Sequence, residues 1–359
     1  MADDPRASAA AARPSTRAGG VPRPSRRRWR GAVALVVWCL ALPFACGELG
    51  LRTASRIGLL SLDTEMWRYA REVKRPSVRP GVVLEHRPNS EATLMGVRVR
   101  TDSHGFRRAD PGLEALRTGR ERLVAVVGDS CVLGWGVPEG ATVSEALERL
   151  MNAAQPDADH RFTVINAGVG NSNTAMEYAR YLADVRPLRP AWVILGFFIN
   201  DAELDPRTTE PPLVEHSVLL AVLSTRIPLL VSPLGRDYNS YYESLYAPRS
   251  AGFQRLLASL RAWGGTLRDD GIPATMLLIP EMHEPRDFGS FVDIYRRLAI
   301  LGAESGFEVV DPSEGFPPGS GKAFWVTPGD SHPDDKAHAV LASALAGSQA
   351  AQQLLHPGS

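Results

Sequence analysis

Short apolar runs alternate with longer amphipathic stretches from residue 122 to residue 355, and this rhythm restricts the fold more than any other feature of the sequence. The apolar runs are residues 122–127, 162–165, 192–198, 274–279 and 307–310, and the amphipathic stretches are residues 142–152, 174–184, 253–268, 291–304 and 337–355. Strands that alternate with helices of this length form a parallel sheet with helices on both faces. Right-handed crossovers then stack the elements in layers. The sequence therefore predicts an α/β fold, a three-layer α/β/α sandwich around a five-stranded parallel sheet.

The first apolar run ends abruptly at a glycine, an acid and a hydroxyl, Gly128-Asp129-Ser130. The preceding residues, 123–127, show no polar alternation, which is typical of a strand buried on both faces of a sheet. Gly128 permits a sharp turn, and Asp129 and Ser130 stand where a helix is expected to begin. One interpretation is that the two polar residues only cap that helix. The other is functional, because open α/β sheets bind ligands at the carboxyl ends of their strands.

Polar residues also follow other predicted strands. Gly170 and Asn171 come after the second strand, Asn200 after the third and His332 after the fifth. Proline favours the first helical position, so Pro333 predicts that His332 lies at or next to the cap of the last helix. All these strand ends are expected to converge on one edge of the sheet. Together they supply a nucleophile, a base and hydrogen-bond donors for an oxyanion, which acyl transfer requires.

With these segments in view, the chain resembles the SGNH/GDSL hydrolase family over residues 122–350. Four segments resemble the sequence blocks of that family in order and spacing: Gly128-Asp129-Ser130, Asn166-Ala167-Gly168-Val169-Gly170-Asn171, Gly196-Phe197-Phe198-Ile199-Asn200-Asp201 and Asp330-Ser331-His332-Pro333. Thr101-Asp102-Ser103-His104-Gly105-Phe106-Arg107 resembles a segment that precedes the first block in membrane-anchored members. The resemblance implies a flavodoxin-like strand order.

The resemblance also implies a role for each matching residue. Ser130 is expected to be the nucleophile and His332 the general base, with Asp330 as the third member of a triad. The expected oxyanion donors are the backbone N–H of Ser130, a backbone N–H in the second block and the side-chain amide of Asn200. The residue that supplies the second-block donor is Gly170 or Asn171.

Two positions depart from the family's pattern. The second block's glycine donor usually stands where this chain has Asn171, with Gly170 one place earlier. A backbone N–H can come from any residue but proline, and asparagine tolerates unusual dihedral angles, so the role can survive the change. The last block is commonly Asp-x-x-His, and its first position here is Gly329. Asp330 stands two residues before His332, and a backbone carbonyl is the alternative group that orients the imidazole.

The amino-terminal part predicts a membrane segment. Residues 1–30 are rich in Ala, Pro, Ser and Arg, which predicts a disordered basic tail. Residues 31–47 are uncharged, and about 17 such residues stand at the short end for a membrane-spanning helix. The helical pattern continues to Arg52, which favours an uncleaved anchor over residues 31–52, with the arginines in the cytoplasm and the rest exported. A cleaved signal peptide, or a lipoprotein signal ending at Cys46, is the alternative.

Charge, cysteine and histidine usage narrow the functional classes. The formal net charge is zero, so no global attraction to nucleic acid is expected. The three cysteines offer no disulfide framework, and Cys131 is expected to be a small buried hydrophobe. His104, His216 and His283 show no spacing that suggests a metal. We therefore expect neither a metal nor a cofactor.

Two further regions accompany the predicted hydrolase domain, residues 121–355. Residues 53–120 predict a connecting region with a short helix at 63–75 and a hairpin at 91–101. Residues 205–250 are too long for a simple connection and predict an insertion. It is expected to be a lid, a surface that rests on the membrane, or a helix packed at the edge of the domain.

The sequence thus predicts a single-pass membrane protein whose exported domain hydrolyses O-acyl esters of a small molecule or a glycan. Family analogy favours O-acetyl glycans as the substrate. A first alternative is an O-acyltransferase that receives acyl groups from a membrane partner and modifies envelope polysaccharide. A second alternative is a glycan-binding envelope protein on a catalytically inactive scaffold, since one fold hosts many functions.

Overall fold

A computed structural model describes residues 26–56, 62–108, 121–155, 161–206, 212–231 and 238–357. Most of the predicted basic tail (1–25) and parts of the predicted connecting region and insertion (57–61, 109–120, 207–211 and 232–237) lie outside the described residues. The chain divides into two compact units, Met1–Leu49 and Gly50–Ser359.

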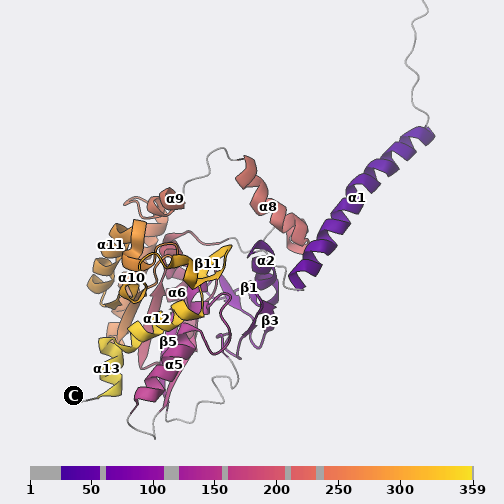
Figure 1. Cartoon of the computed structure of the whole chain (residues 1–359). Helices are drawn as coiled ribbons and strands as arrows, with labels where there is room; N and C mark the ends of the chain where they lie inside the picture. Colours follow the sequence, from indigo (N-terminus) through magenta and orange to yellow (C-terminus); the bar gives the residue numbers. More distant parts are fainter. Residues whose placement is uncertain are drawn as a thin grey trace, which may run out of the picture. The chain divides into compact units, whose positions relative to one another are not determined.

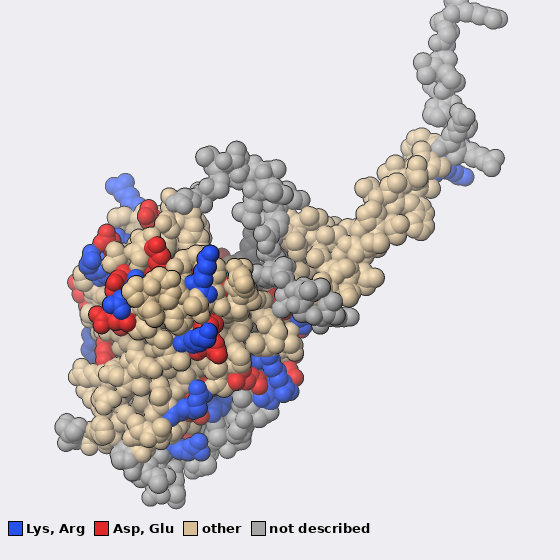
Figure 2. Space-filling view, in the orientation of Figure 1, with Lys and Arg blue, Asp and Glu red and all other residues tan. Residues whose placement is uncertain are grey.

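Helix α1 (Arg26–Arg56) contains the predicted membrane segment. Its stretch Trp29–Ala54 has 26 residues and is long and apolar enough to cross a membrane. The helix includes Arg52, as the sequence pattern predicts, but it extends further, to Arg56, and it begins within the predicted tail, at Arg26. Most of the drawn surface of α1 is uncharged in Figure 2, whereas basic and acidic side chains are interspersed on the visible face of the second unit. The length and composition of α1 suit a signal anchor and a signal peptide alike.

The second unit is built on a sheet of five parallel strands, which confirms the predicted α/β fold (Figure 1). The strands are β5 (Glu121–Gly128), β6 (Arg161–Asn166), β7 (Trp192–Phe197), β8 (Ala274–Leu278) and β9 (Glu308–Val310). Their spatial order is β6-β5-β7-β8-β9. This is the flavodoxin-like order, in which the chain reverses its direction of winding between β5 and β7. A crevice for ligands is expected at the carboxyl ends of these two strands.

Helices cover both faces of the sheet and complete the predicted sandwich. One face carries α5 (Val143–Ala154), α12 (Asp335–Ala346) and α13 (Gln349–Leu355), and the other carries α6 (Thr174–Arg180), α10 (Ala251–Asp269) and α11 (Val292–Glu304). Strand β5 alternates between the two cores, with Val124 and Val126 packed on the α5 side and Ala125 and Val127 on the α10 side. Fully burying one such valine contributes about 1.5–3 kcal/mol, which explains the uninterrupted apolar run.

Residues 62–108 form a small layer against the nucleophile end of the sheet. The predicted short helix is α2 (Leu62–Glu72), and the predicted hairpin is β3 (Glu91–Leu94) with β4 (Val97–Arg100). A further antiparallel pair joins β1 (Lys74–Pro76) to β2 (Leu84–His86). A third buried cluster combines Tyr69, Leu94 and Val99 of this layer with Leu133 and Trp135, which follow the first sequence block.

Arg107 ties this layer to the short helix α4 (Ser130–Leu133). Its backbone N–H donates to the Asn166 carbonyl at 3.0 Å, and its guanidinium donates to the carbonyls of Leu133 at 2.9 Å and Val137 at 2.6 Å. The carbonyls at a helix end have no partner within the helix, so a buried cation is well suited to them. The segment that resembles membrane-anchored family members therefore braces the carboxyl end of α4.

The carboxyl-terminal region differs from the prediction in two ways. Pro333 does not open a helix, because β11 (Asp330–Pro333) pairs antiparallel with β10 (Trp325–Thr327). The helix begins later, since the Asp334 side chain accepts the N–H groups of Lys336 and Ala337 and thereby caps α12. The expected single helix over residues 337–355 is also two helices, α12 and α13. The Ser348 hydroxyl caps α13 by accepting the N–H of Ala351, so the second helix starts independently.

The described part of the insertion (205–206, 212–231 and 238–250) contains the helices α7 (Pro212–His216), α8 (Val218–Val231) and α9 (Tyr238–Leu245). Helix α8 packs against α2. Next to α9, the Tyr246 hydroxyl donates to the Ile199 carbonyl at 2.8 Å. Within α9, the Tyr241 hydroxyl donates to the Glu203 carboxylate at 2.7 Å. These contacts attach α9 to the loop that follows β7.

Candidate active site

The first sequence block forms a tight turn from β5 into α4. A Cβ atom on Gly128 would lie 2.4 Å from Val132 Cγ2 and 2.7 Å from the Gly196 carbonyl oxygen, so only glycine fits there. Asp129 caps α4, because its Oδ1 accepts the N–H of Cys131 at 2.8 Å. The expected capping role of Asp129 is therefore present. The turn leaves Ser130 at the carboxyl edge of the central strand.

Ser130, His332 and Asp330 meet in one hydrogen-bonded chain. Ser130 Oγ lies 3.0 Å from His332 Nε2, although the two residues are 202 positions apart in the sequence. His332 Nδ1 lies 2.6 Å from Asp330 Oδ1, and the His332 backbone N–H donates to the same oxygen at 3.1 Å. A carboxylate only accepts, so Nδ1 carries the proton and Nε2 is free to accept the Ser130 hydroxyl. Asp330 thus reaches the imidazole in spite of the departure at Gly329.

Asp330 is held as a buried carboxylate. Its side chain is 2 % exposed, against 24 % for His332. The indole N–H of Trp135 donates to Asp330 Oδ2 at 2.9 Å. Burial by itself raises the pKa of Asp330, but the hydrogen bonds and charge of His332 and the bond from Trp135 outweigh burial and hold this pKa below its ordinary value. The carboxylate therefore stays ionised and fixes the tautomer of His332.

His332 is positioned by a hairpin and not by a helix cap. It lies in β11, next to Pro333, whose position pairs with Trp325 of β10. The expected position of His332, at the cap of the last helix or next to it, is therefore wrong. The helix cap is Asp334, two residues further along the chain.

Asn200 lies beside the acid of the first block. It belongs to the 3-10 turn η3 (Ile199–Ala202) after β7, and its Nδ2 donates to Asp129 Oδ2 at 2.9 Å. Burial raises the pKa of Asp129, against the hydrogen bonds from Cys131 and Asn200. Asp201 closes the same turn by accepting the Phe198 N–H at 3.3 Å. The amide of Asn200 thus has one N–H engaged and a second N–H available to a ligand.

The two candidates in the second block lie in different environments. Gly170 is buried, and its N–H donates to the Tyr69 hydroxyl at 2.9 Å. Asn171 is exposed and has a φ of 63°, in the left-handed region that asparagine tolerates. The same loop is attached to the nucleophile turn, because the Gly128 carbonyl accepts the N–H of Val169 at 2.9 Å.

The remaining polar candidates have structural surroundings. Cys131 is buried, and burial raises the pKa of its thiol well above the ordinary value, which disfavours a reactive thiolate. His338 Nδ1 accepts the Val143 N–H at 2.8 Å inside the core, and burial lowers the pKa of His338 to about 3. Within the described ranges, no group of three or more His, Cys, Asp or Glu side chains could hold a metal ion.

The residues that support the site through hydrogen bonds to its members were not predicted from the sequence. Trp135, Tyr69 and Lys74 contact Asp330, Gly170 and Asn171, respectively. None of the three stands in a recognised block. A weak signal existed only for the neighbouring segment 101–107, whose Arg107 braces α4.

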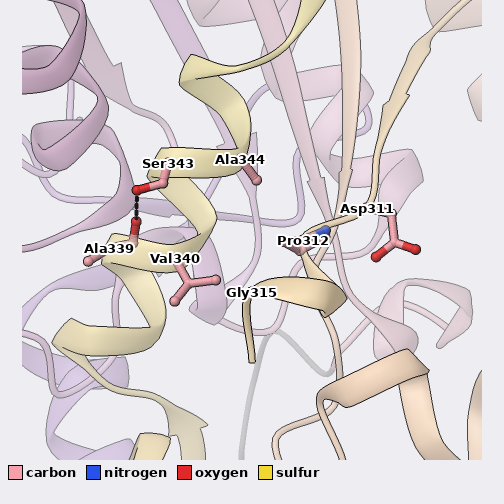
Figure 3. A pocket seen from close by; sticks show the side chains of 7 residues that line it. All are labelled: Asp311, Pro312, Gly315, Ala339, Val340, Ser343 and Ala344. Atoms are coloured by element: carbon pink, nitrogen blue, oxygen red, sulfur yellow. Dashed lines mark hydrogen bonds between the residues drawn. The ribbon is translucent and has the colours of Figure 1, made fainter. Parts of the chain in front are cut away.

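A separate pocket lies away from these residues. Figure 3 shows it between α12 and the turn after β9, lined by Asp311, Pro312, Gly315, Ala339, Val340, Ser343 and Ala344, with a volume of about 500 Å³. None of the predicted site residues lines it. The candidate active site is therefore the triad at the sheet edge and not this pocket.

The chain was compared with known proteins. A model of the GDSL-like Lipase/Acylhydrolase family matches residues 126–340. The alpha/beta hydrolase LAE5 from the metagenome of Lake Arreo is 18% identical at a TM-score of 0.39, over 66% of this chain and 97% of that one. A catalytic mutant of Axe2, an acetylxylan esterase from Geobacillus stearothermophilus, is 18% identical at a TM-score of 0.41, over 65% of this chain and 96% of that one. The lipase/acylhydrolase from Enterococcus faecalis is 16% identical at a TM-score of 0.37, over 62% of this chain and 93% of that one. No curated protein matches the chain.

Proposed function

The chain belongs to the GDSL-like lipase/acylhydrolase family and is a hydrolase that acts on ester bonds, and we propose that Ser130 is its nucleophile, His332 its general base and Asp330 the residue that orients the base. One observation carries this assignment: Ser130 Oγ lies 3.0 Å from His332 Nε2 while His332 Nδ1 lies 2.6 Å from Asp330 Oδ1. A nucleophile, a base and an orienting carboxylate within hydrogen-bond reach are the defining geometry of serine hydrolases.

In the proposed reaction, Ser130 Oγ attacks the carbonyl carbon of the ester and its proton passes to His332 Nε2. The tetrahedral intermediate then collapses, the bond to the alcohol oxygen breaks, and His332 returns the proton to that oxygen. A water molecule repeats the sequence on the acyl-enzyme and releases the acid. Asp330 stays ionised throughout and stabilises the imidazolium that forms in each half-reaction.

The proposed oxyanion donors are the backbone N–H of Ser130, the free N–H of the Asn200 side chain and a backbone N–H of the second block. Asn200 is supported by its contact with Asp129, because an acceptor-only carboxylate directs the Nδ2 end of the amide toward the nucleophile turn. Loss of one oxyanion donor costs about 10²–10³ in kcat, so we expect Asn200→Ala to fall in that range.

Covalent labelling tests the proposed nucleophile directly. A fluorophosphonate probe is expected to label the wild-type chain at Ser130, with the adduct located by peptide mapping, and to leave Ser130→Ala and His332→Ala unlabelled. Turnover of p-nitrophenyl acetate is measured on the same samples. Full turnover by Ser130→Ala contradicts the mechanism, and a folded wild-type chain that neither labels nor turns over supports the inactive glycan-binding alternative.

We also propose an O-acetylated glycan as the substrate. The support comes from Trp325, which pairs across the hairpin with Pro333, the residue next to the proposed base. Its indole N–H already donates to the Met282 carbonyl at 2.7 Å, and its side chain is partly exposed. A partly exposed aromatic ring offers the flat apolar surface on which the C–H groups of a sugar ring pack.

A substrate ratio tests this proposal. In Trp325→Ala, the ratio of kcat/KM for an acetylated xylo-oligosaccharide to that for p-nitrophenyl acetate is expected to fall about tenfold, since one aromatic contact contributes roughly 1–2 kcal/mol. An unchanged ratio contradicts a role of Trp325 in glycan binding. Product analysis with a free sugar as acceptor separates the hydrolase from the acyltransferase, because only the latter forms a new sugar ester in preference to acetate.

We propose, finally, that α1 is an uncleaved anchor and that the domain after it is exported. The support is the apolar stretch Trp29–Ala54, which follows a cluster of arginines. A chain tagged after Ser359 is expected to remain in the membrane fraction at full length. A soluble product that has lost residues 1–46 contradicts the anchor and supports a cleaved signal.

A further inference from the structure

The peptide units before and after Gly170, which carry the N–H groups of Gly170 and Asn171, are held by side chains from residues 62–108, a segment that precedes the family-matched residues 126–340. Either of the two residues could supply the backbone donor of the second block. The contacts around the two peptide units distinguish Gly170 from Asn171, because each contact restricts which backbone N–H can face the reacting oxygen.

Tyr69 engages the amide of Gly170. The Gly170 N–H donates to the Tyr69 hydroxyl at 2.9 Å, and that hydroxyl lies 2.6 Å from His86 Nε2. His86 Nδ1 lies 3.1 Å from the Gly105 carbonyl, which only accepts, so Nε2 accepts the proton of Tyr69. Burial, helped by the charge of Arg180, lowers the pKa of His86 well below its ordinary value and keeps the ring neutral. The N–H of Gly170 is therefore engaged in a buried chain of hydrogen bonds.

The Tyr69 ring leaves no free space beside the Gly170 backbone. A Cβ atom on Gly170 would lie 2.8 Å from Tyr69 Cε1, so the tyrosine ring packs directly on the backbone. Tyr69 itself is fully buried, and its ring contacts Trp135 at a centroid distance of 5.5 Å. The ring is thus fixed by the same cluster that supports Asp330.

Lys74 holds the next peptide unit, between Gly170 and Asn171. Its Nζ donates to the Gly170 carbonyl at 3.1 Å and to Asn171 Oδ1 at 3.0 Å, and it lies 4.6 Å from the centroid of the Tyr69 ring. In a trans peptide the C=O and the following N–H point in opposite directions. A lysine that holds the Gly170 carbonyl therefore directs the Asn171 N–H away from the buried layer.

The residues around this peptide differ in exposure. Asn171 is exposed, whereas Gly170 and Lys74 are buried. The loop is attached to the Gly128 carbonyl by the Val169 N–H at 2.9 Å and by the Ser172 hydroxyl at 3.2 Å. In the described residues, no hydrogen bond of the Asn171 N–H to another group is found. This amide is thus free to bind a ligand.

We propose that Tyr69, which occupies the Gly170 N–H, and Lys74, which fixes the Gly170–Asn171 peptide, are positioning residues, so that Asn171 and not Gly170 supplies the second-block N–H to the oxyanion. This inference rests on the proposed function of Ser130 and His332. The Lys74 cation on the Gly170 carbonyl also polarises the peptide and strengthens its N–H as a donor. The layer formed by residues 62–108 therefore completes the oxyanion site of the family-matched domain.

The test compares two variants with two matched controls in the full chain. Lys74→Met removes the ammonium and keeps the length of the side chain, and Tyr69→Phe removes only the hydroxyl. Lys336→Met removes an exposed lysine of α12, and Tyr178→Phe removes a hydroxyl that bonds Thr266 at 2.8 Å and not Gly170 or Asn171. The readouts are kcat and KM for p-nitrophenyl acetate and Ki for phenylboronic acid, whose serine adduct places an oxygen in the oxyanion site.

Lys74→Met and Tyr69→Phe are each expected to lower kcat about 10- to 100-fold, short of the roughly 10²–10³ lost with a whole donor. KM is expected to change little, and Ki for phenylboronic acid is expected to rise in proportion to the loss of kcat/KM, because both report stabilisation of the tetrahedral state. The two controls are expected to remain within about threefold of wild type. A purely structural defect lowers the amount of active protein without raising Ki.

Rates are normalised to the fraction of chains that a fluorophosphonate labels at completion. If Lys74→Met does not fold, the result for Tyr69→Phe decides the test. Lys74→Arg, which keeps the cation, is expected to recover part of the loss. Wild-type kcat and Ki in both variants overturn the inference and leave the proposed function intact, provided that Ser130→Ala is inactive. Activity in Ser130→Ala overturns the proposed function itself.

Discussion

Two histidines that each follow an acidic residue by two positions, His332 and His283, have almost the same local geometry. His332 Nδ1 lies 2.6 Å from Asp330 Oδ1, and His283 Nδ1 lies 2.5 Å from Glu281 Oε1. In each pair the backbone N–H of the histidine also donates to the acid, at 3.1 Å for His332 and 2.9 Å for His283. Both acids are buried, but the Glu281 pair follows β8 of the five-stranded sheet, whereas the Asp330 pair lies in β11 of the separate hairpin.

The surroundings of the two imidazoles differ. His332 Nε2 meets Ser130 Oγ at 3.0 Å. The His283 ring packs on Trp325 at a centroid distance of 4.6 Å, and its side chain is 47 % exposed, against 24 % for His332. An acid-x-histidine segment can therefore orient an imidazole by itself. It becomes the base of a hydrolase only where another part of the chain brings a hydroxyl to the free nitrogen.

Replacing each histidine tests this comparison with the largest expected effect. His332→Ala is expected to lower kcat for p-nitrophenyl acetate by about 10³–10⁶-fold, because the nucleophile loses its base. His283→Ala is expected to stay within about threefold of wild type, since its ring contacts no proposed catalytic group. Steady-state kinetics on both variants decide the matter, and a similar loss in both would show that the two pairs act together.

Replacing the acids sharpens the comparison. Asp330→Asn keeps the shape but loses the acceptor that fixes the tautomer of His332, and we expect kcat to fall by about 10²–10⁴. Glu281→Gln makes the corresponding change beside His283, and we expect a change below about threefold. The same esterase assay is used for both. If Asp330→Asn keeps wild-type kcat, another group orients the base and Asp330 is not the third member of the triad.

A smaller effect is expected from the indole that supports Asp330. Trp135→Phe removes the N–H that donates to Asp330 Oδ2 at 2.9 Å, and we expect kcat to fall about three- to tenfold with a stability loss of about 1–3 kcal/mol. Trp192→Phe is the control, because it removes a buried indole N–H that donates to Thr275 at 2.9 Å. It is expected to lose similar stability in urea unfolding but no activity per folded molecule. Equal losses of kcat in the two variants argue against a specific role of Trp135.

The smallest expected effect is on the pH dependence of stability. Because the folded-state pKa of Asp330 lies below its ordinary value of 3.8, its ionised form contributes stability above that value. This contribution is lost as the pH falls through the lower folded-state pKa. The Tm of the wild type is therefore expected to fall, relative to that of Asp330→Asn, as the pH is lowered from 6 to below 3.8. A difference in Tm that does not change with pH contradicts the assigned direction.

Several parts of the fold were predictable because short-range patterns determine them. The apolar run that became β5 is buried on both faces, and Gly128 is required by contacts under 3 Å on two sides. The hairpin of β10 and β11 was not predicted. Pro333 suits a helix start, but it pairs with Trp325, and that long-range pairing decided its conformation. Sequence preference for a helix start therefore yielded to tertiary pairing.

The same division applies to the candidate site. The block residues Ser130, Asn200 and His332 could be named from the sequence because the chemistry requires those residue types at strand ends. The residues that hold them in place could not be named from the sequence. Tyr69 bonds a residue 101 positions away, and Trp135 bonds one 195 positions away. A buried tyrosine and a buried tryptophan also resemble ordinary core residues in sequence.

The sequence by itself determined the order of the strands and helices, the glycine turn at the nucleophile and the kinds of groups at the sheet edge, because periodicity and local sterics act over a few residues. Only the tertiary structure decided that Asp330 reaches His332, that His332 and not His283 faces Ser130, and that Gly170 is turned toward Tyr69. These outcomes depend on the directions of single hydrogen bonds between distant segments. Such directions are set by packing, which no local pattern encodes.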